Sequence, residues 1–238
     1  MPKPKTKKES PNQKKINTPK VAEKKKVTKK KKPAKITRQP SIGNFPSPIA
    51  KSVRSGITSI KVIGVGGGGG NAVSRMMEGD RIKGVEFIAA NTDAQDLNYA
   101  NSHKKVYIGK ALTRGLGAGM NPDIGKQAAE ENRSEIGELM EGSDVVFITA
   151  GMGGGTGSGA SPIIAEIARE RGILTVGIVT KPFSFEGTHR RKQGEDGVHR
   201  LKDKVDSLIV IPNDRLTAIS DEQVTMSNAF AMADDERR

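Results

Sequence analysis

The sequence predicts an α/β fold in which a mostly parallel sheet is covered by helices on both faces. From residue 58 to residue 238, short apolar runs rich in β-branched residues alternate with amphipathic, helix-like segments. This alternation is typical of consecutive strand–helix–strand units. Strands that alternate with helices in this way imply a parallel sheet covered on both faces.

Six runs are expected to be strands. They are residues 59–65 (SIKVIGV), 85–91, 104–109, 144–150, 173–180 and 206–212. Each run is short and is bounded by glycine, proline or polar residues, which commonly punctuate strands.

Five further segments are expected to be helices. They are residues 71–78, 122–141, 161–172, 185–205, and a last helix that starts near Asp221. In 122–141, Ile124, Ala128 and Ile136 recur at helical spacing, opposite a charged face. Pro162 is tolerated in the first turn of a helix, and Gly172 is a stop signal. The segment 185–205 is polar and contains three glycines.

Residues 1–57 differ sharply in composition from the rest of the chain. They hold 18 lysines and arginines against two acidic residues, whereas residues 58–238 hold 22 basic and 25 acidic residues. Self-repulsion and a shortage of apolar residues predict a disordered tail. It is either a solvated extension or an electrostatic contact to an anionic membrane or nucleic acid. No aromatic residue lies between the lysines to stack on bases.

Several classes of protein are excluded by the composition. The chain has no cysteine, which rules out disulfides and thiolate chemistry and fits a cytoplasmic location. No apolar run approaches the about 20 residues of a membrane-spanning helix, and the N-terminus lacks the apolar core of a secretory signal.

Two glycine clusters follow expected strands and open expected helices. They are GVGGGGGN (64–71) and GMGGGTGSG (151–159). Ligands of parallel α/β sheets bind at the carboxyl ends of the strands. Helix N-termini there present unpaired N–H groups, and glycine lets a phosphate approach the backbone closely. A slack linker is the alternative, but linkers are uncommon between a buried strand and an amphipathic helix.

The sequence leaves open which phosphate ligand binds. Gly64, Gly66 and Gly69 satisfy the dinucleotide fingerprint, with Glu86 and Asp93 at plausible distances for a ribose contact. A nicotinamide-dependent oxidoreductase is therefore one hypothesis. Neither cluster contains the Gly-Lys-Ser/Thr of a Walker P-loop. Backbone amides, helix dipoles and a metal ion must then hold the nucleotide.

Six segments in order resemble the tubulin/FtsZ family, and specifically FtsZ, the bacterial tubulin homologue of cell division. They are VIGVGGGGGNAV (62–73), NTDAQ (91–95), GLGAGMNP (115–122), GMGGGTGSG (151–159), TKPFSFEG (180–187) and IPNDRL (211–216). The resemblance implies a Rossmann-like, three-layer GTP-binding domain over residues 58–238. It also implies GTP or GDP with Mg²⁺, head-to-tail filaments of the chain itself, and contacts with division-ring proteins at midcell.

The resemblance also implies which residues contact GTP. They are Gly67, Gly68, Asn71, Gly117, Ala118, Gly119, Gly153, Gly154, Gly155, Thr156, Gly157, Glu186, Arg190, Asn213, Phe230 and Asp235. The first three would meet the α- and β-phosphates, and 117–119 would sense the γ-phosphate. The second cluster would bind the β- and γ-phosphates. Glu186 would contact the ribose, Arg190 the phosphates, and the last three residues the guanine.

Four of these residues have plainer interpretations that the sequence does not exclude. The Thr156 hydroxyl either binds a phosphate oxygen or the Mg²⁺, or caps a helix. Glu186 and Arg190 are also spaced as a surface ion pair. Asn213 is also placed to cap a helix, and Phe230 to pack in the core. His103, His189 and His199 are expected on the surface, because they show no metal-ligand spacing.

In the family, the sequence continues beyond the position of Arg238 through the rest of a central helix and a C-terminal domain. The acidic loop that activates water on the neighbouring subunit's nucleotide is expected to lie in that part. The chain is therefore expected to carry the nucleotide-binding half of a GTPase and no catalytic residue of its own. The alternative function is a non-hydrolysing partner that caps full-length filaments.

Overall fold

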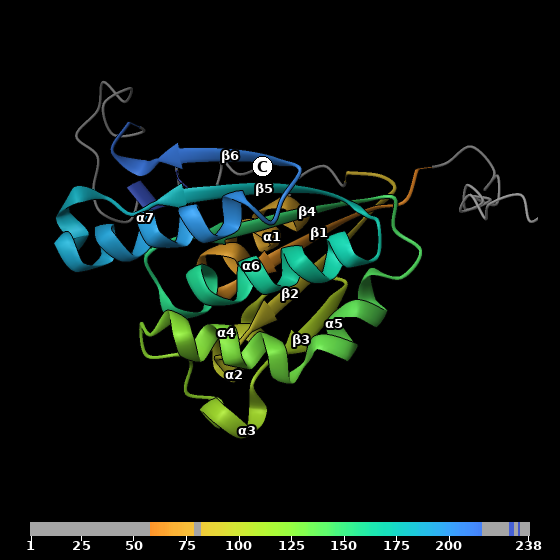
Figure 1. Ribbon diagram of the computed structural model, residues 1–238, viewed down its shortest axis with the longest axis horizontal. Coiled ribbons are helices and arrows are strands. Elements are labelled where there is room, and N and C mark those ends of the chain that lie inside the picture. Colours follow the sequence, from red (N-terminus) through yellow and green to blue (C-terminus); the bar gives the residue numbers. More distant parts are fainter. Residues whose placement is uncertain (1–57, 79–81, 216–228, 231–232, 234–238) are drawn as a thin grey trace, which may run out of the picture. The chain divides into compact units, whose positions relative to one another are not determined.

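The computed structural model describes residues 58–78, 82–215, 229–230 and 233 (Figure 1). The lysine-rich stretch 1–57, the expected helix start near Asp221, and Asp235 lie outside the described residues. None of the described helices combines the length and the apolar character needed to cross a membrane.

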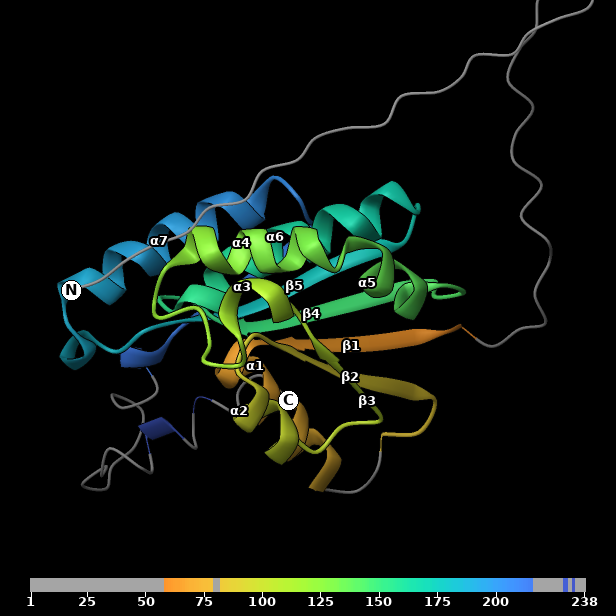
Figure 2. The ribbon, with the colours of Figure 1, turned by 90° about the horizontal axis from the view of Figure 1, so that it is seen from below.

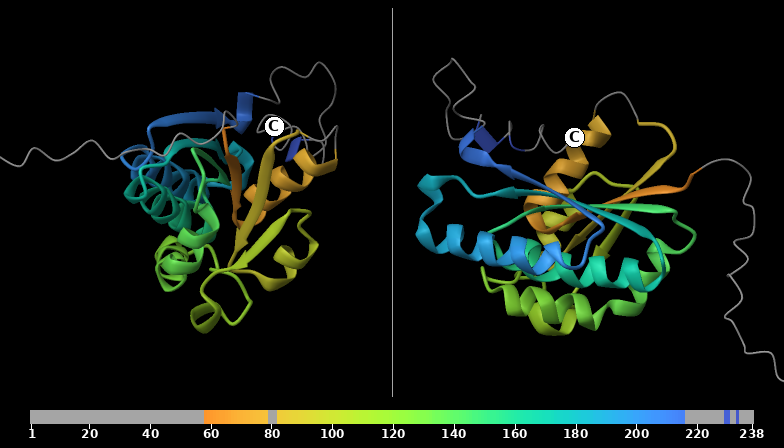
Figure 3. Two further views of the ribbon diagram at one scale, coloured as in Figure 1. Left: turned by 90° about the vertical axis from the view of Figure 1, so that its right-hand side faces the viewer. Right: turned by 45° about the horizontal axis from the view of Figure 1, so that its top comes forward.

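Six strands form one sheet in which every pairing is parallel. They are β1 (Ile60–Val65), β2 (Val85–Asn91), β3 (Lys104–Tyr107), β4 (Val145–Gly151), β5 (Leu174–Lys181) and β6 (Ser207–Pro212). Their order across the sheet is β3-β2-β1-β4-β5-β6. All six arrows therefore end at the same edge (Figure 3). The expected strands are confirmed, and the order is that of the Rossmann fold.

Helices cover both faces of this sheet (Figure 2). The helical elements are α1 (Gly66–Glu78), α2 (Ala94–Tyr99), α3 (Lys110–Thr113), α4 (Pro122–Glu131), α5 (Arg133–Met140), α6 (Gly155–Glu170), the 3₁₀ turn η1 (Ser184–Glu186) and α7 (Thr188–Lys202). Helices α1 and α2 lie on one face, and α4 to α7 lie on the other. The main apolar core, with Val65, Ile148 and Ile164 fully buried, lies between the sheet and the larger helical layer.

Two helices begin earlier than the sequence predicts, inside the glycine clusters. Helix α1 starts at Gly66 and not at residue 71, and α6 starts at Gly155 and not at residue 161. Pro162 therefore lies inside α6 and not in its first turn. Glycine normally disfavours a helix, but here close packing requires it. A Cβ on Gly69 would collide with the Thr149 carbonyl oxygen, and one on Gly157 with the Gly151 carbonyl oxygen.

The expected single helix over 122–141 is broken at Asn132 into α4 and α5. The Asn132 side chain accepts a hydrogen bond from the Gly109 N–H (2.8 Å) and donates one to Glu135 (2.7 Å). A contact 23 residues away in sequence therefore decides the break. The short helices α2 and α3 were not predicted.

The polar segment 185–205 does form a helix, α7, over Thr188–Lys202. Two of its glycines pack closely against neighbouring side chains. A Cβ on Gly194 would come 2.9 Å from Pro182 Cδ, and one on Gly197 would come 3.0 Å from both Met152 and Ser158. The glycines that weakened the sequence signal for a helix therefore allow α7 to lie close against α6 and the loop after β4.

Candidate functional site

A cleft of about 620 Å³ opens at the carboxyl edge of the sheet. It lies where the strand order reverses between β1 and β4, the usual ligand position in open parallel sheets. Fourteen of the sixteen residues that the resemblance assigned to GTP line this cleft. They are Gly67, Gly68, Asn71, Gly117, Gly119, Gly153, Gly154, Gly155, Thr156, Gly157, Glu186, Arg190, Asn213 and Phe230. Ala118 is buried just behind the lining, and Asp235 lies outside the described residues.

The N-termini of two helices converge at the centre of the cleft. Gly66, the first residue of α1, has a φ of +72°, and a Cβ there would lie 3.1 Å from the Gly157 amide nitrogen of α6. Neither helix has an acidic residue in its first turn. Unpaired N–H groups and the positive ends of both helix dipoles therefore face the same space, which favours an anion.

The glycines of the second cluster serve different purposes. Gly153 has a φ of +105°, and its N–H donates to the Ser158 hydroxyl (2.8 Å). Gly155 has no room for a side chain, since a Cβ would lie 2.8 Å from both Ala118 and the Asn121 amide nitrogen. Gly154 is different, because nothing lies within 4 Å of its Cβ position. Packing within the fold therefore does not require glycine at position 154, although this residue lines the cleft.

The Thr156 hydroxyl does not cap a helix, so that interpretation was wrong. Thr156 is the second residue of α6, and the N-cap is Gly154. The Thr156 Oγ1 atom shares a hydrogen bond of 2.6 Å with the Oγ1 atom of Thr92. Thr92 is fully buried at the end of β2 and also lines the cleft. It was missed as a site residue, although it lies in the NTDAQ segment.

Of the two acidic residues considered for a dinucleotide, only one is at the cleft. Asp93 lines it and caps α2 by accepting from the Gln95 and Asp96 N–H groups. Glu86 lies toward the opposite end of β2, paired with Lys61 (3.2 Å) and Lys104 (2.7 Å). Burial alone would raise the pKa of Glu86, but the hydrogen bonds from the two lysines outweigh burial and lower it.

The Glu186–Arg190 ion pair exists, but it is part of the cleft wall. Arg190 Nη1 donates to Glu186 Oε2 (2.6 Å), and the Glu186 side chain is only 11% exposed. Glu186 Oε1 also accepts from the Phe183 N–H (2.8 Å), which holds the carboxylate in place. Arg190 is the one cationic side chain among the described residues that line the cleft.

The far end of the cleft carries an aromatic ring and a buried amide. Phe230 is 42% exposed, and its ring packs edge-to-face against Phe183, with centroids 5.4 Å apart. Ala229 and Ala233, on either side of it, make the core contacts instead. The interpretation of Phe230 as a core residue is therefore wrong. One edge of the ring packs against Phe183, but nearly half of the residue's surface stays exposed.

Asn213 directly follows β6 and is 5% exposed. Its Oδ1 atom is buried and has no hydrogen-bond partner, so the helix-capping interpretation is also wrong. A buried acceptor without a partner costs free energy, on the order of 1–3 kcal/mol. Because Asn213 lines the cleft, a ligand with an N–H donor would supply that partner.

Sequence reasoning also missed a contact between two segments of the cleft wall, the turn after β5 and the end of β6. Ser184 donates to Asp214 twice, from its N–H (2.8 Å) and its hydroxyl (2.6 Å). These bonds lower the pKa of Asp214. They join the turn that carries Phe183 and Glu186 to the end of β6. Both segments were recognised as motifs, but their contact was not visible in the sequence.

The metal-binding capacity of the cleft is limited. Among the described residues there is no group of three or more potential metal ligands, and His103, His189 and His199 are exposed, as predicted. Two carboxylates, Asp93 and Asp96, line the cleft together with the Thr156 hydroxyl. This donor set fits a Mg²⁺ ion that is held partly by phosphates, since Mg²⁺ commonly uses one or two carboxylates and the substrate.

Comparison with known proteins gives a consistent result. The family model for the tubulin/FtsZ family, GTPase domain, matches residues 59–221. The empty FtsZ dimer of M. jannaschii has 48% sequence identity and a TM-score of 0.73, covering 76% of this chain and 52% of that chain. The GDP-bound CetZ1 monomer of Haloferax volcanii has 25% identity and a TM-score of 0.68, covering 75% and 57%.

A third solved structure shares the fold at lower identity. It is the GTPγS-bound protofilament of CetZ2 from Haloferax volcanii, with 24% identity and a TM-score of 0.67, covering 75% of this chain and 55% of that chain. The chain spans about half the length of these proteins. Because the family model covers well over half of the chain and the fold and cleft agree with it, the chain belongs to the tubulin/FtsZ family and carries its GTPase domain.

Proposed function

We propose that the chain binds GTP and GDP in the cleft, with the guanine at Asn213 and Phe230. The unpaired, buried Asn213 Oδ1 atom is the observation that carries this assignment. Guanine offers N1–H and N2–H donors on one edge, whereas adenine has an acceptor at N1. The open part of the Phe230 ring provides a surface for the base.

The opposite end of the cleft suits the phosphates. The N–H groups at the starts of α1 and α6 point to a shared space, and Thr156 adds a hydroxyl. Thr92 orients that hydroxyl through the 2.6 Å hydrogen bond. Arg190, held by Glu186, adds a guanidinium that can donate to a phosphate, although the pair as a whole carries no net charge. Mg²⁺, when bound, would neutralise phosphate charge, and Asp93 with Asp96 would face it.

A nicotinamide dinucleotide is the less favoured ligand. The acidic residue expected near its ribose was Glu86 or Asp93, and Glu86 lies away from the cleft. Asp93 lines the cleft, but one of its carboxylate oxygens, Oδ1, already accepts both N–H groups of the α2 cap, which leaves only Oδ2 for a ligand. The dinucleotide fingerprint also requires only one glycine-rich turn, whereas this cleft is lined by two glycine clusters.

We further propose that the whole protein is a cytoskeletal GTPase of cell division. Its subunits would associate head-to-tail and hydrolyse GTP at the contact between them, in a cytoplasmic ring at midcell with other division proteins. The dimer and protofilament among the similar structures support self-association. The cleft rim supports it too, because Leu116 is 84% exposed and Met120 is 39% exposed there. Exposed apolar residues at a rim favour burial against another protein.

The role of residues 1–57 remains a sequence-based proposal. The stretch is either a solvated extension or an electrostatic contact, and we propose that any contact with anionic vesicles or DNA is made by charge alone, because the stretch is strongly basic and lacks interleaved aromatic residues. Such binding would disappear near about 1 M salt, where the screening length falls to about 3 Å. Binding that persists at that salt concentration would contradict a contact made by charge alone.

Nucleotide binding is tested by equilibrium titration with fluorescently labelled GTP, followed by competition with GDP, ATP and NAD. We expect GTP and GDP to displace the label and ATP and NAD to displace it poorly. NAD binding without guanine preference would overturn the assignment. For assembly, GTP-dependent sedimentation of the whole protein is expected, and Leu116→Glu is expected to reduce it. Because Leu116 lines the cleft, nucleotide titration of the same variant separates weaker assembly from weaker GTP binding.

A further inference from the structure

The loop between α3 and α4 is held in an unusual backbone conformation. Arg114, Gly115, Gly117, Gly119 and Met120 all have positive φ values, from +51° to +84°. Glycine adopts such values freely, but a residue with a Cβ does so at a cost in free energy. Arg114 and Met120 therefore keep this conformation only because surrounding contacts enforce it.

The first part of the loop is fixed by its own surroundings. The Gly115 carbonyl accepts from the Ala94 N–H (3.2 Å), and Leu116 forms a bridge with Asp93. Ala118 is 4% exposed and packs where Gly155 leaves no room for a side chain. These contacts secure the start and the middle of the loop, and a turn closed by the Asn121 N–H on the Ala118 carbonyl (2.9 Å) spans Gly119 and Met120.

The end of the loop is tied to a different part of the molecule. The Met120 carbonyl accepts a hydrogen bond from Gln193 Nε2 on α7 (2.9 Å). Among the described residues, no other hydrogen bond joins the loop to α7. Gln193 does not line the cleft, and its Oε1 atom is buried without a partner. The amide therefore makes one contact, and that contact is with the loop.

We propose that Gln193 is a positioning residue that holds the 117–119 segment over the outermost phosphate and so favours a nucleoside triphosphate over a diphosphate. This inference rests on the proposed function. Gln193 is one helical turn from Arg190 on α7, so a single helix carries both the cleft cation and the tie. Met120 lies directly after Gly119, so releasing its carbonyl leaves the strained end of the segment held by the local turn alone.

The size and direction of the effect follow from one hydrogen bond. Losing it is expected to weaken triphosphate binding about three- to tenfold, the range for one net hydrogen bond. Diphosphate binding is expected to change less than about twofold, because the segment would not reach the inner phosphates. A general structural defect would instead weaken both nucleotides equally.

The test compares GTPγS and GDP titrations for variants that differ in hydrogen-bond donation. Gln193→Met has nearly the same size but cannot donate, and we expect it to lower the GTPγS-to-GDP affinity ratio. Gln193→Lys donates and is expected to restore the ratio. Gln127→Met on the exposed side of α4 is the matched control, with no expected change. Met120→Gly combined with Gln193→Met is expected to recover part of the loss, because glycine tolerates the positive φ.

Hydrogen exchange of residues 114–121 in nucleotide-free protein gives an independent readout. Exchange is expected to be faster in Gln193→Met and near the wild-type rate in Gln193→Lys. An unchanged affinity ratio in Gln193→Met, or equal loss of both nucleotides, would overturn the inference. No rescue by Gln193→Lys would do so as well. If the wild-type chain bound no guanine nucleotide, the proposed function itself would fail, and the inference with it.

Discussion

Gly154 offers the sharpest test of the idea that the second glycine cluster faces a ligand. Its φ and ψ of −94° and 173° lie in the extended region, which alanine adopts without strain. Nothing lies within 4 Å of its Cβ position. Gly154→Ala therefore adds a methyl group to open space at a residue that lines the cleft, and the fold can accept it.

The effects of Gly154→Ala on the stability of the fold and on GTP affinity can be estimated separately. Alanine is a poorer helix N-cap than glycine, at a cost of about 0.5–1 kcal/mol. It also makes the unfolded chain less flexible, which returns about 0.4–1 kcal/mol. The free energy of unfolding is therefore expected to change by less than about 0.5 kcal/mol. Blocking one amide–phosphate hydrogen bond costs about 1.5–3 kcal/mol, which corresponds to about ten- to 150-fold weaker GTP binding.

The assay measures labelled GTP affinity and urea unfolding on the same protein. Gly69→Ala is the contrasting variant, because its Cβ would collide with the Thr149 carbonyl oxygen beneath α1. We expect Gly69→Ala to lower the free energy of unfolding by about 1–3 kcal/mol, as overpacking does. A stable Gly154→Ala protein that binds GTP within about twofold of wild type would refute the reasoning.

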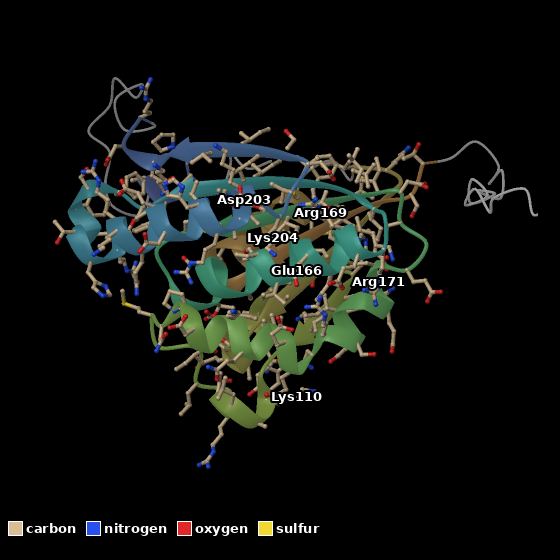
Figure 4. The ribbon with its side chains drawn as sticks, viewed as in Figure 1. Lys110, Glu166, Arg169, Arg171, Asp203 and Lys204 are labelled. Atoms are coloured by element: carbon tan, nitrogen blue, oxygen red, sulfur yellow. The ribbon has the colours of Figure 1, made fainter. Side chains whose placement is uncertain are left out.

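Three further predictions address guanine recognition by Asn213, the role of Asp235, and the pH dependence of stability at Glu166. Asn213→Leu is expected to remove the preference for GTP over ATP in competition titrations, because the amide that reads the guanine edge is lost. Asp235→Ala is expected to weaken GTP and spare ATP. If Asp234→Ala had this effect instead, Asp234 and not Asp235 would be the carboxylate that contacts the guanine. The side chains of Glu166 and Lys204 form an ion pair where α6 meets the segment after α7 (Figure 4). Lys204 and Arg133 together lower the pKa of Glu166 below 4.5. The ion pair therefore stabilises the fold above pH 4.5 and loses its effect as pH falls through the lowered pKa, so Glu166→Gln is expected to flatten the urea-unfolding profile there.

Most of the fold could be predicted because its signals are local in the sequence. The strands are apolar runs bounded by breakers, and all six were located. The helix boundaries failed where tertiary packing overrides propensity. The glycines at 66–70 and 155–159 disfavour a helix by themselves, yet α1 and α6 begin there because only glycine fits against β4 and α4. The break at Asn132 depends on Gly109, which no local rule connects to it.

The cleft could be predicted for a related reason. Its wall consists largely of backbone, and glycine-rich turns at strand ends are visible in the sequence. The residues that orient this wall are connected only by the fold. Thr92 meets Thr156 across 64 positions, and Ser184 meets Asp214 across 30. The tie from Gln193 to Met120 spans 73 positions and had no signal in the sequence.

A crystal structure of the chain with GTPγS and Mg²⁺ tests the central claim most directly. The predicted result places the guanine N1–H or N2–H at Asn213 Oδ1 and the base against Phe230. The phosphates are expected on the amides between Gly153 and Gly157. A nucleotide bound outside the cleft, or one whose base leaves Asn213 Oδ1 unpaired, would contradict the account.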